Sequence, residues 1–519
     1  MTQAAGEIVT TRNGAVRGER LANDVTCFRG LPFAAPPVGP LRWQAPQPPA
    51  LWQGVRDCTQ FGPVPVQQRF TGESLFPTRE EPQSEDCLHL NVWTPAADEG
   101  AGWPVIVWFY LGAFQLGSGS APFYHGQSWA KAGAVFVTLN FRLGKLGFLA
   151  HAALRDEDPD GVCGNYGFLD QIAALEWVRD NIAAFGGDPD CVTIFGSSSG
   201  ASSVSLLMAS SRAAGLFHRA IAESGGSFGP VAETTGVGDR WQTLDAAMRS
   251  GTAWAEGVGA SRLEELRALA GHVVMAPSAA SRKAGQGAFD AARPIVDGRT
   301  IAAGSYAVFA AQRQAKVPLL VGSAANEDLA TVNLAPDLAT YLAQARQEHG
   351  AAVDAFLELY PAQDDVQAVV SGLKANAHRL FTWQNWTWAR LHARSGADVY
   401  YYRFEQVPPV PPGRYPQQQL PRPLGAFHGA SLFYSFDRFA LREEWAWTAE
   451  DRHLSETMIA AWVQFARTGR PAADGLPEWP RFDPARPRVM AMRQDAAMAD
   501  IPDLDRMRFW DGYYGVSGA

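Results

Sequence analysis

Gly-Ser-Ser-Ser-Gly at residues 196–200 is the stretch that decides the fold of this 519-residue chain. It follows the run 192–195, Val-Thr-Ile-Phe, which predicts a buried strand, and it precedes the run 201–208, which predicts a helix packed on that strand. A serine between a strand and a helix, with glycines two residues before and after it, is typical of a nucleophile elbow, a sharp turn that holds the hydroxyl out into a site. Of the three serines, only Ser198 has both glycines at that spacing.

A second stretch, Gly-Gly-Ser-Phe-Gly at residues 225–229, also fits the bare spacing around Ser227. Pro230 follows it at once and no helical pattern comes next, so it does not complete the order of strand, turn and helix. Five small residues in a row also fit an ordinary turn. The elbow interpretation therefore requires a base, an acid and an oxyanion site elsewhere in the chain.

Apolar runs around the elbow predict an α/β fold. Residues 105–109, 134–139 and 192–195 are continuous apolar runs of strand length, as expected for a parallel sheet covered on both faces. Residues 169–185 have helical periodicity, and strands that alternate with helices favour a large, mostly parallel central sheet flanked by helices. Short alternating segments near the start, such as residues 14–18, predict a small antiparallel N-terminal sheet.

Composition and charge argue against several other classes of protein. The net charge of −9, with no basic stripe, disfavours nucleic acid and anionic membranes as partners. No apolar run reaches the roughly 18 residues of a membrane span, and the first residues lack a signal-peptide pattern, which favours a cytoplasmic protein, with a trimmed signal as the alternative. Five cysteines without a CxxC pair, the histidine spacings and the lack of a glycine-rich phosphate loop predict no metal and no cofactor. Oligomeric state stays open.

Six further segments have distinctive sequences: residues 28–43, 52–55, 84–93, 140–148, 164–189 and 458–469. Together with the elbow, and in this order, they resemble the type-B carboxylesterase family of the α/β-hydrolase fold, which includes the cholinesterases. The resemblance implies a single α/β-hydrolase domain over residues 1–519 that hydrolyses a small-molecule carboxylic ester. Residues around 230–300 and 335–420 match the family loosely, and we expect these excursions to carry substrate choice.

The base and the acid of such a site follow the serine along the chain in the order serine, acid, histidine. His428, in Gly-Ala-Phe-His-Gly at residues 425–429, matches the family's histidine motif, and we expect it to take the Ser198 proton. Glu327 lies five residues after Gly322, the end of a predicted buried strand, where the family has its acid. A carboxylate there would orient the imidazole; a solvated loop charge is the alternative role, and Asp328 is the fallback acid.

The oxyanion site needs backbone N–H groups aimed at the charge that develops on the carbonyl oxygen. The candidates are Gly112 and Ala113, in the loop after the strand 105–109, and Ser199, directly after the nucleophile. An ordinary glycine turn after a core strand is the alternative. Leu111 stands where the family has the first of two glycines, and because leucine tolerates positive φ poorly, we expect a local change in the backbone there.

Two serines replace family carboxylates. The family has Glu immediately before the nucleophile and Glu three residues after the histidine, where this chain has Ser197 and Ser431. Losing both together avoids stranding one buried charge. We therefore hypothesise a pocket that is less negative than that of a cholinesterase and has less reason to favour cationic substrates. Ser197→Glu alone should then lower stability or activity, and a stable variant with raised choline-ester turnover would contradict this.

The pairing of Cys87 and the role of an aromatic cluster each have two possible interpretations. Cys87 stands where exported family members hold one end of a disulfide, but residues 62–67 contain no partner; Cys58 is the alternative partner, and a reduced protein is the simpler interpretation. An aromatic cluster would either line an acyl pocket or pack as helix core; its members are Phe381, Trp383, Trp386 and Trp388.

The same three catalytic residues would also cleave a carbamate or an activated amide. The fold also includes esterase-like binding proteins that have lost a member of the triad. Here all three positions are filled, which disfavours a non-catalytic role.

Overall fold

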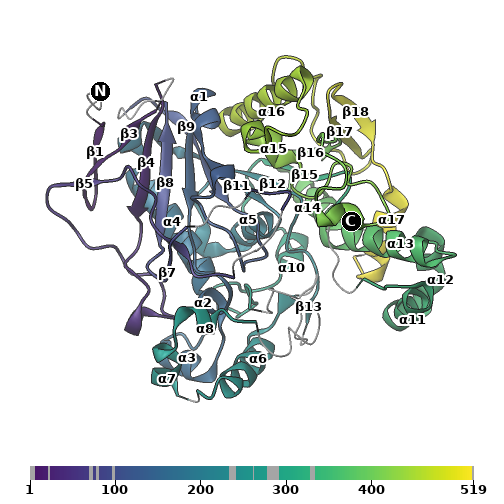
Figure 1. The fold of residues 1–519 in the computed structure, drawn as a ribbon, viewed down its shortest axis with the longest axis horizontal. Coiled ribbons are helices and arrows are strands. Elements are labelled where there is room, and N and C mark those ends of the chain that lie inside the picture. Colours follow the sequence, from purple (N-terminus) through teal and green to yellow (C-terminus); the bar gives the residue numbers. More distant parts are fainter. Residues whose placement is uncertain are drawn as a thin grey trace.

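The computed structural model describes residues 6–21, 24–68, 74–77, 81–95, 100–232, 241–260, 262–277, 292–327 and 334–516 (Figure 1). Its centre is an 11-stranded sheet with the strand order β18-β17-β16-β15-β12-β11-β9-β10-β8-β4-β3. These strands are β3 (Glu19–Arg20), β4 (Thr26–Pro32), β8 (His89–Thr94), β9 (Trp103–Phe109), β10 (Val135–Leu139), β11 (Gly187–Ser197), β12 (Arg219–Glu223), β15 (Leu319–Ala324), β16 (Val399–Phe404), β17 (Arg488–Met492) and β18 (Ala497–Asp500).

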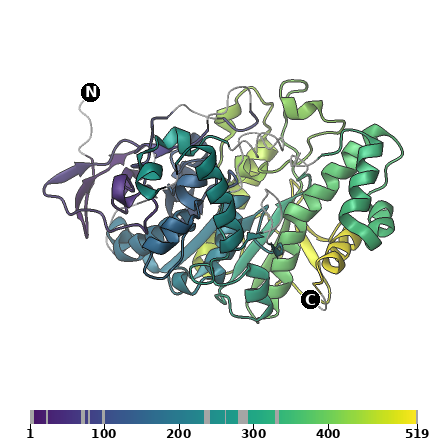
Figure 2. The same ribbon diagram turned by 90° about the horizontal axis from the view of Figure 1, so that it is seen from below.

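The middle of this sheet is parallel, from β10 through β9, β11, β12, β15 and β16 to β17, and the strands at both edges pair antiparallel. The three apolar runs predicted as strands are the cores of β9, β10 and β11. Every residue of β10 is buried, which requires cover on both faces of the sheet. Helices provide that cover, as the turned view shows (Figure 2). The α/β-hydrolase prediction is confirmed.

The helices that flank the sheet include α4, which follows the periodicity predicted over residues 169–185, and α5, which begins at the elbow and packs on β11, β12 and β9. Their bounds, and those of the other α-helices in the described residues, are α1 (Gln127–Lys131), α2 (Gly144–Phe148), α3 (Ala152–Glu157), α4 (Tyr166–Asn181), α5 (Ser199–Ala209), α6 (Leu244–Gly257), α7 (Leu263–Ala268), α8 (Gly271–Val274), α10 (Ser305–Ala310), α11 (Leu338–His349), α12 (Val353–Leu359), α13 (Asp365–Ala377), α14 (Trp383–Ala393), α15 (Ser431–Ser435), α16 (Ala449–Thr468) and α17 (Leu504–Tyr513).

The small N-terminal sheet contains β1 (Ile8–Thr11), β2 (Gly14–Arg17) and β5 (Val55–Asp57). β1 and β2 pair antiparallel, as predicted, whereas β5 adds to β2 in parallel, so the sheet as a whole is mixed. Two further two-stranded sheets lie in loops: β6 (Val64–Pro65) with β7 (Gln83–Ser84), and β13 (Val231–Ala232) with β14 (Trp241–Gln242).

The loosely matching segments contribute differently to the fold. Residues 230–300 supply α6, α7 and α8, outside the central sheet, whereas residues 335–420 also supply β16, a strand inside that sheet. The helices α11, α12 and α13 lie at one end of the molecule beside α17 (Figure 1). Within the described residues, none of the helices has both the length and the apolar character that a membrane crossing requires.

Candidate active site

The elbow is built as the glycine spacing predicts. β11 ends at Ser197 and α5 begins at Ser199, while Ser198 between them has φ 55° and ψ −119°. A non-glycine residue with such a backbone costs on the order of 1–3 kcal/mol. The turn is held by the Ser198 N–H, which donates to the Glu223 carbonyl (2.9 Å), and by the Ser198 carbonyl, which accepts from the Ser202 N–H (3.0 Å).

Both glycines of the elbow are required by close packing. A Cβ atom on Gly196 would overlap the carbonyl group of Gly200, and one on Gly200 would overlap the carbonyl oxygen of Phe109, the last residue of β9. The start of α5 therefore lies directly against the end of β9. This contact brings the loop that follows β9 to the elbow.

Ser227, the other serine with glycines at elbow spacing, is placed quite differently. Its side chain is fully buried, and its hydroxyl bonds to Ser205 Oγ (2.6 Å) and Ser305 Oγ (2.5 Å). Ser227 is therefore a buried core residue whose hydroxyl is hydrogen-bonded to two other serine hydroxyls.

His428 and Glu327 are joined directly. His428 Nδ1 lies 2.5 Å from Glu327 Oε2, and Glu327 is 1% exposed. The second carboxylate oxygen, Oε1, accepts from the Ala324 N–H at 2.7 Å. Both carboxylate oxygens are therefore occupied, which fixes the carboxylate and leaves Nε2 of the imidazole directed away from it. Asp328, the fallback acid, lies outside the described residues.

The loops that carry this pair are tied to each other. The Asn326 N–H donates to the Ala426 carbonyl (2.9 Å), and the Ala426 N–H donates back to Asn326 Oδ1 (3.0 Å). Gly425, at φ 60°, packs so closely on the Asn326 side chain that a Cβ atom there would overlap it. Asn326, where the family commonly has aspartate, thus joins the acid loop to the histidine loop.

The serine and the histidine are not yet in hydrogen-bond contact: among the described residues, Ser198 Oγ makes no bond to the imidazole of His428. Catalytic hydrogen bonds are often long without substrate and tighten in the complex. The transfer of a proton from Ser198 to His428 therefore stays a prediction.

The loop after β9 presents the predicted oxyanion donors. Gly112, Ala113 and Phe114 have φ values of 131°, 56° and 61°, and the Gly112 carbonyl closes the turn by accepting from the N–H groups of Gln115 (2.9 Å) and Leu116 (3.0 Å). Leu111 itself does not take a positive φ. The left-handed conformation falls on the three residues after it.

These donors stand free to bind an anion. The N–H groups of Gly112 and Ala113 donate to no described residue. Ser199 is the first residue of α5, where N–H groups have no partner inside the helix and the helix dipole favours negative charge. Because Gly200 lies against the end of β9, the loop after β9 and the start of α5 meet at the elbow.

A buried carboxyl that the sequence analysis missed lies behind the elbow. Glu223, the last residue of β12, pairs in register with Ser197 and is fully buried. Its Oε2 accepts from Ser431 Oγ (3.0 Å), while Oε1 has no hydrogen-bond partner among the described residues. Burial raises the pKa of Glu223 to about 7, an effect partly offset by Ser431 and by the nearby Trp462 and Tyr402. The sequence does contain one sign of this residue: Glu223 is a single charged residue directly after the apolar run 220–222.

Glu223 changes the hypothesis of a less negative pocket. Ser197 and Ser431 stand where the resemblance implies two carboxylates, but the Ser431 hydroxyl donates to another carboxyl, that of Glu223. The site therefore keeps one buried, titratable acid, and its charge depends on pH.

The substitution Glu223→Gln is expected to remove a pH dependence of stability. Between pH 4.5 and 7 the folded protein holds a proton on Glu223 that the unfolded chain has lost, so the free energy of unfolding falls as the pH rises through this window. The full loss is about 3 kcal/mol. The wild type should therefore lose this stability between pH 4 and pH 8, whereas the variant should not. The free energy of unfolding of the variant minus that of the wild type, measured by urea unfolding, should rise by about that amount over this range. A difference that is constant with pH would show that Glu223 titrates normally.

The aromatic cluster divides into two parts. Trp383, Trp386 and Trp388 are buried core residues, as the packing alternative predicted. Phe381 is only partly buried, and its ring lies 4.2 Å from the imidazole of His428. Sequence alone gave no reason to separate it from the tryptophans.

The cysteines form no disulfide, and the described residues offer no metal-binding cluster. All five cysteines are free; Cys58 and Cys87 are both buried and do not pair, and burial raises the pKa of the Cys58 thiol to about 12. Within the described ranges, no group of three or more His, Cys, Asp or Glu side chains is placed to hold a metal ion.

Comparisons with known proteins show which family this chain resembles. The sequence profile of the "Carboxylesterase family" matches residues 5–510. Fumonisin B1 esterase of Sphingopyxis macrogoltabida is 37% identical over 91% of this chain and 84% of its own length, and para-nitrobenzyl esterase of Bacillus subtilis is 33% identical over 96% and 97%. Among solved structures, a PNB esterase has a TM-score of 0.81 at 31% identity, and a Geobacillus stearothermophilus carboxylesterase has 0.80 at 32%, each covering 97% of this chain and 99% of its own.

Proposed function

Because the chain belongs to the carboxylesterase family and is a carboxylic-ester hydrolase, we propose that Ser198 is its nucleophile, His428 its general base and Glu327 the acid that orients the base. The observation that carries this proposal is the 2.5 Å contact between His428 Nδ1 and Glu327 Oε2. Glu223 supports it, because its carbonyl accepts from the Ser198 N–H and its carboxyl accepts from Ser431, three residues after His428. The oxyanion donors are the N–H groups of Gly112, Ala113 and Ser199.

The geometry supports a two-step reaction through an acyl-enzyme. Glu327 accepts a hydrogen bond from the Nδ1–H of His428, so Nε2 keeps its lone pair and takes the Ser198 proton as Oγ attacks the ester carbonyl. The negative charge on the carbonyl oxygen falls between the loop after β9 and the start of α5, and each donor there is worth on the order of 3 kcal/mol. His428 then protonates the leaving alkoxide, and water repeats the sequence to release the acid.

The substrate is a small-molecule ester. Two relatives are named for esters, of fumonisin B1 and of a para-nitrobenzyl group. Residues 230–300 and 335–420, which match the family loosely, are proposed to set the acyl and alcohol preference, as parts of one domain over residues 1–519. A panel of esters in which acyl and alcohol lengths vary separately will define the acyl and alcohol preference.

We also propose that the enzyme works in a reducing compartment such as the cytoplasm, since all five cysteines are free and most are buried. Titration of the denatured, unreduced protein with a thiol reagent should then find five thiols. A count of three would mean that Cys58 and Cys87, or another pair, form a disulfide.

Two measurements on the wild-type protein test the catalytic proposal. Para-nitrophenyl acetate should give a burst of nitrophenol equal to the enzyme concentration, because the acyl-enzyme accumulates. An organophosphate should add one phosphoryl group, which peptide mapping will locate on Ser198. Folded protein that gives neither a burst nor an adduct would refute the proposal, and an adduct on another serine would refute the assignment.

A further inference from the structure

A π-helical turn, His378–Thr382, joins α13 to α14 without a break. Such turns are rare and occur frequently at functional sites. This one carries Phe381, whose ring lies 4.2 Å from the imidazole of His428 with 33° between the planes. We propose that Phe381 is a positioning residue for His428, which keeps Nε2 aimed at the nucleophile; this rests on the proposed function of His428.

The π-helical turn sets which way Phe381 faces. Each residue of an α-helix rotates the next by about 100°, so the wider turn changes the direction of Phe381 relative to α14. The orientation of α14 itself is fixed by Asp511 of α17, which accepts from Trp383 Nε1 (2.9 Å) and from an Arg390 guanidinium nitrogen (2.6 Å). With α14 held in this way, the π-helical turn is what directs Phe381 to the histidine.

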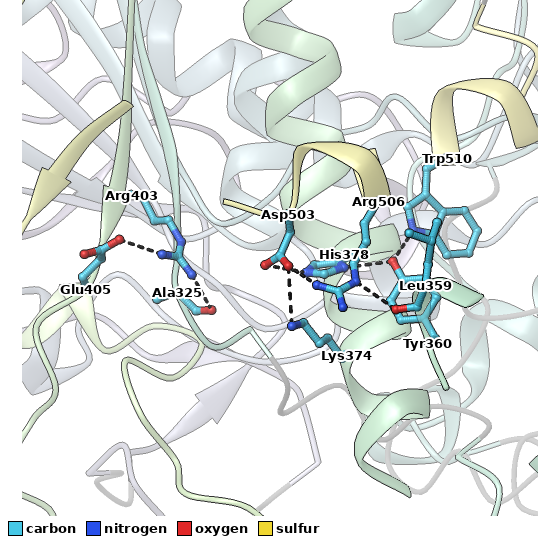
Figure 3. A network of polar contacts seen from close by, with 10 residues as sticks. All are labelled: Ala325, Leu359, Tyr360, Lys374, His378, Arg403, Glu405, Asp503, Arg506 and Trp510. Atoms are coloured by element: carbon cyan, nitrogen blue, oxygen red, sulfur yellow. Dashed lines mark hydrogen bonds and ion pairs between the residues drawn. The ribbon is translucent and has the colours of Figure 1, made fainter. Parts of the chain in front are cut away.

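The other end of the turn is anchored by a polar network (Figure 3). His378 Nδ1 bonds to the Tyr360 hydroxyl (2.9 Å), and its Nε2 lies 3.7 Å from Asp503 Oδ2. The Tyr360 hydroxyl also accepts from Trp510 Nε1 (3.0 Å), and burial lowers the pKa of His378 to about 3, so the ring is neutral at working pH. Both ends of the turn are therefore rigid, and Phe381 is held in place before substrate arrives.

His428 needs such support because Glu327 holds it at one atom only. A hydrogen bond at Nδ1 still lets the ring swing about that contact, and the His428 side chain is 16% exposed. Phe381 packs against the ring and blocks the swing. It also shields from water the imidazolium that forms during attack, and an aromatic face stabilises such a cation.

Substitutions at Phe381 test this proposal through the separate effects on kcat and KM. We expect Phe381→Leu to lower kcat about tenfold and Phe381→Ala about a hundredfold, as for a catalytic group misplaced by an ångström, with KM changed less than threefold. Phe381→Tyr, which keeps the ring, should restore kcat to within about threefold of the wild type.

Phe309→Leu is the matched control. Phe309 is fully buried in α10 and packs on Phe228 and Trp388, away from His428, so its substitution should lower the melting temperature and leave kcat unchanged. If Phe381→Leu raises KM at constant kcat, or if Phe309→Leu lowers kcat equally, the proposal is overturned. Organophosphate labelling of Ser198 in the wild type separates these results from a failure of the proposed function, since it does not depend on Phe381.

Discussion

Ser198→Ala is expected to lower kcat by roughly 10⁴- to 10⁶-fold, the loss seen when the nucleophile of a catalytic triad is removed. The fold should survive, because Ser198 is held by its backbone: its N–H and carbonyl bond to Glu223 and Ser202, and its side chain makes no capping bond at the start of α5. The burst with para-nitrophenyl acetate should disappear while the melting temperature stays near that of the wild type.

Ser227→Ala gives the opposite pattern and is the control. The Ser227 hydroxyl lies between Ser205 and Ser305 in the core, so its loss leaves buried hydroxyls with fewer partners and costs about 1–3 kcal/mol of stability. kcat should change little. If Ser227→Ala abolished the burst and Ser198→Ala kept it, the elbow assignment would be wrong.

Glu327→Gln is expected to lower kcat by about 10³- to 10⁴-fold. The amide is nearly the same size as the carboxylate, but it cannot stabilise the imidazolium, and its NH₂ group facing Nδ1 would favour the wrong tautomer of His428. The Ala324 N–H can still bond to the amide oxygen, so the loop should keep its shape. Steady-state kinetics and circular dichroism together will separate the loss of activity from a loss of fold.

Asp328→Asn is the matched control for the acid, since it neutralises the neighbouring carboxylate by the same chemical change. Its kcat should stay within about threefold of the wild type. An inactive Asp328→Asn beside an active Glu327→Gln would reassign the acid to the fallback residue.

The parts of the fold that the sequence predicted are those with local signals. The strands β9, β10 and β11 are continuous apolar runs, and the elbow between β11 and α5 needs glycines at fixed spacing because of backbone contacts. The apolar runs and the spacing of the two glycines are both patterns within a few positions, which a single sequence displays, even though Gly200 is required by its contact with Phe109.

Other parts depend on contacts between distant residues. In the sequence, Glu223 looks like an ordinary glutamate at the end of a strand. Its burial depends on the pairing of β12 with β11 and on Ser431, which is 208 positions away in the chain. The positive φ values after Leu111 belong to a turn that closes through hydrogen bonds to the Gly112 carbonyl, and the leucine alone does not reveal that turn. Phe381 was not distinguished from its tryptophan neighbours, since the π-helical turn has no sequence signature.

The tie between Asn326 and Ala426 bears on how such enzymes can be recombined. These residues are 100 positions apart, yet their reciprocal hydrogen bonds make the acid loop and the histidine loop one rigid unit. A chimera with a relative that has aspartate in place of Asn326 would replace an amide partner of the Ala426 N–H by a charged one. Residues 322–327 and 425–428 should therefore be exchanged together, as a single cassette, if the hybrid is to keep its acid and its base in register.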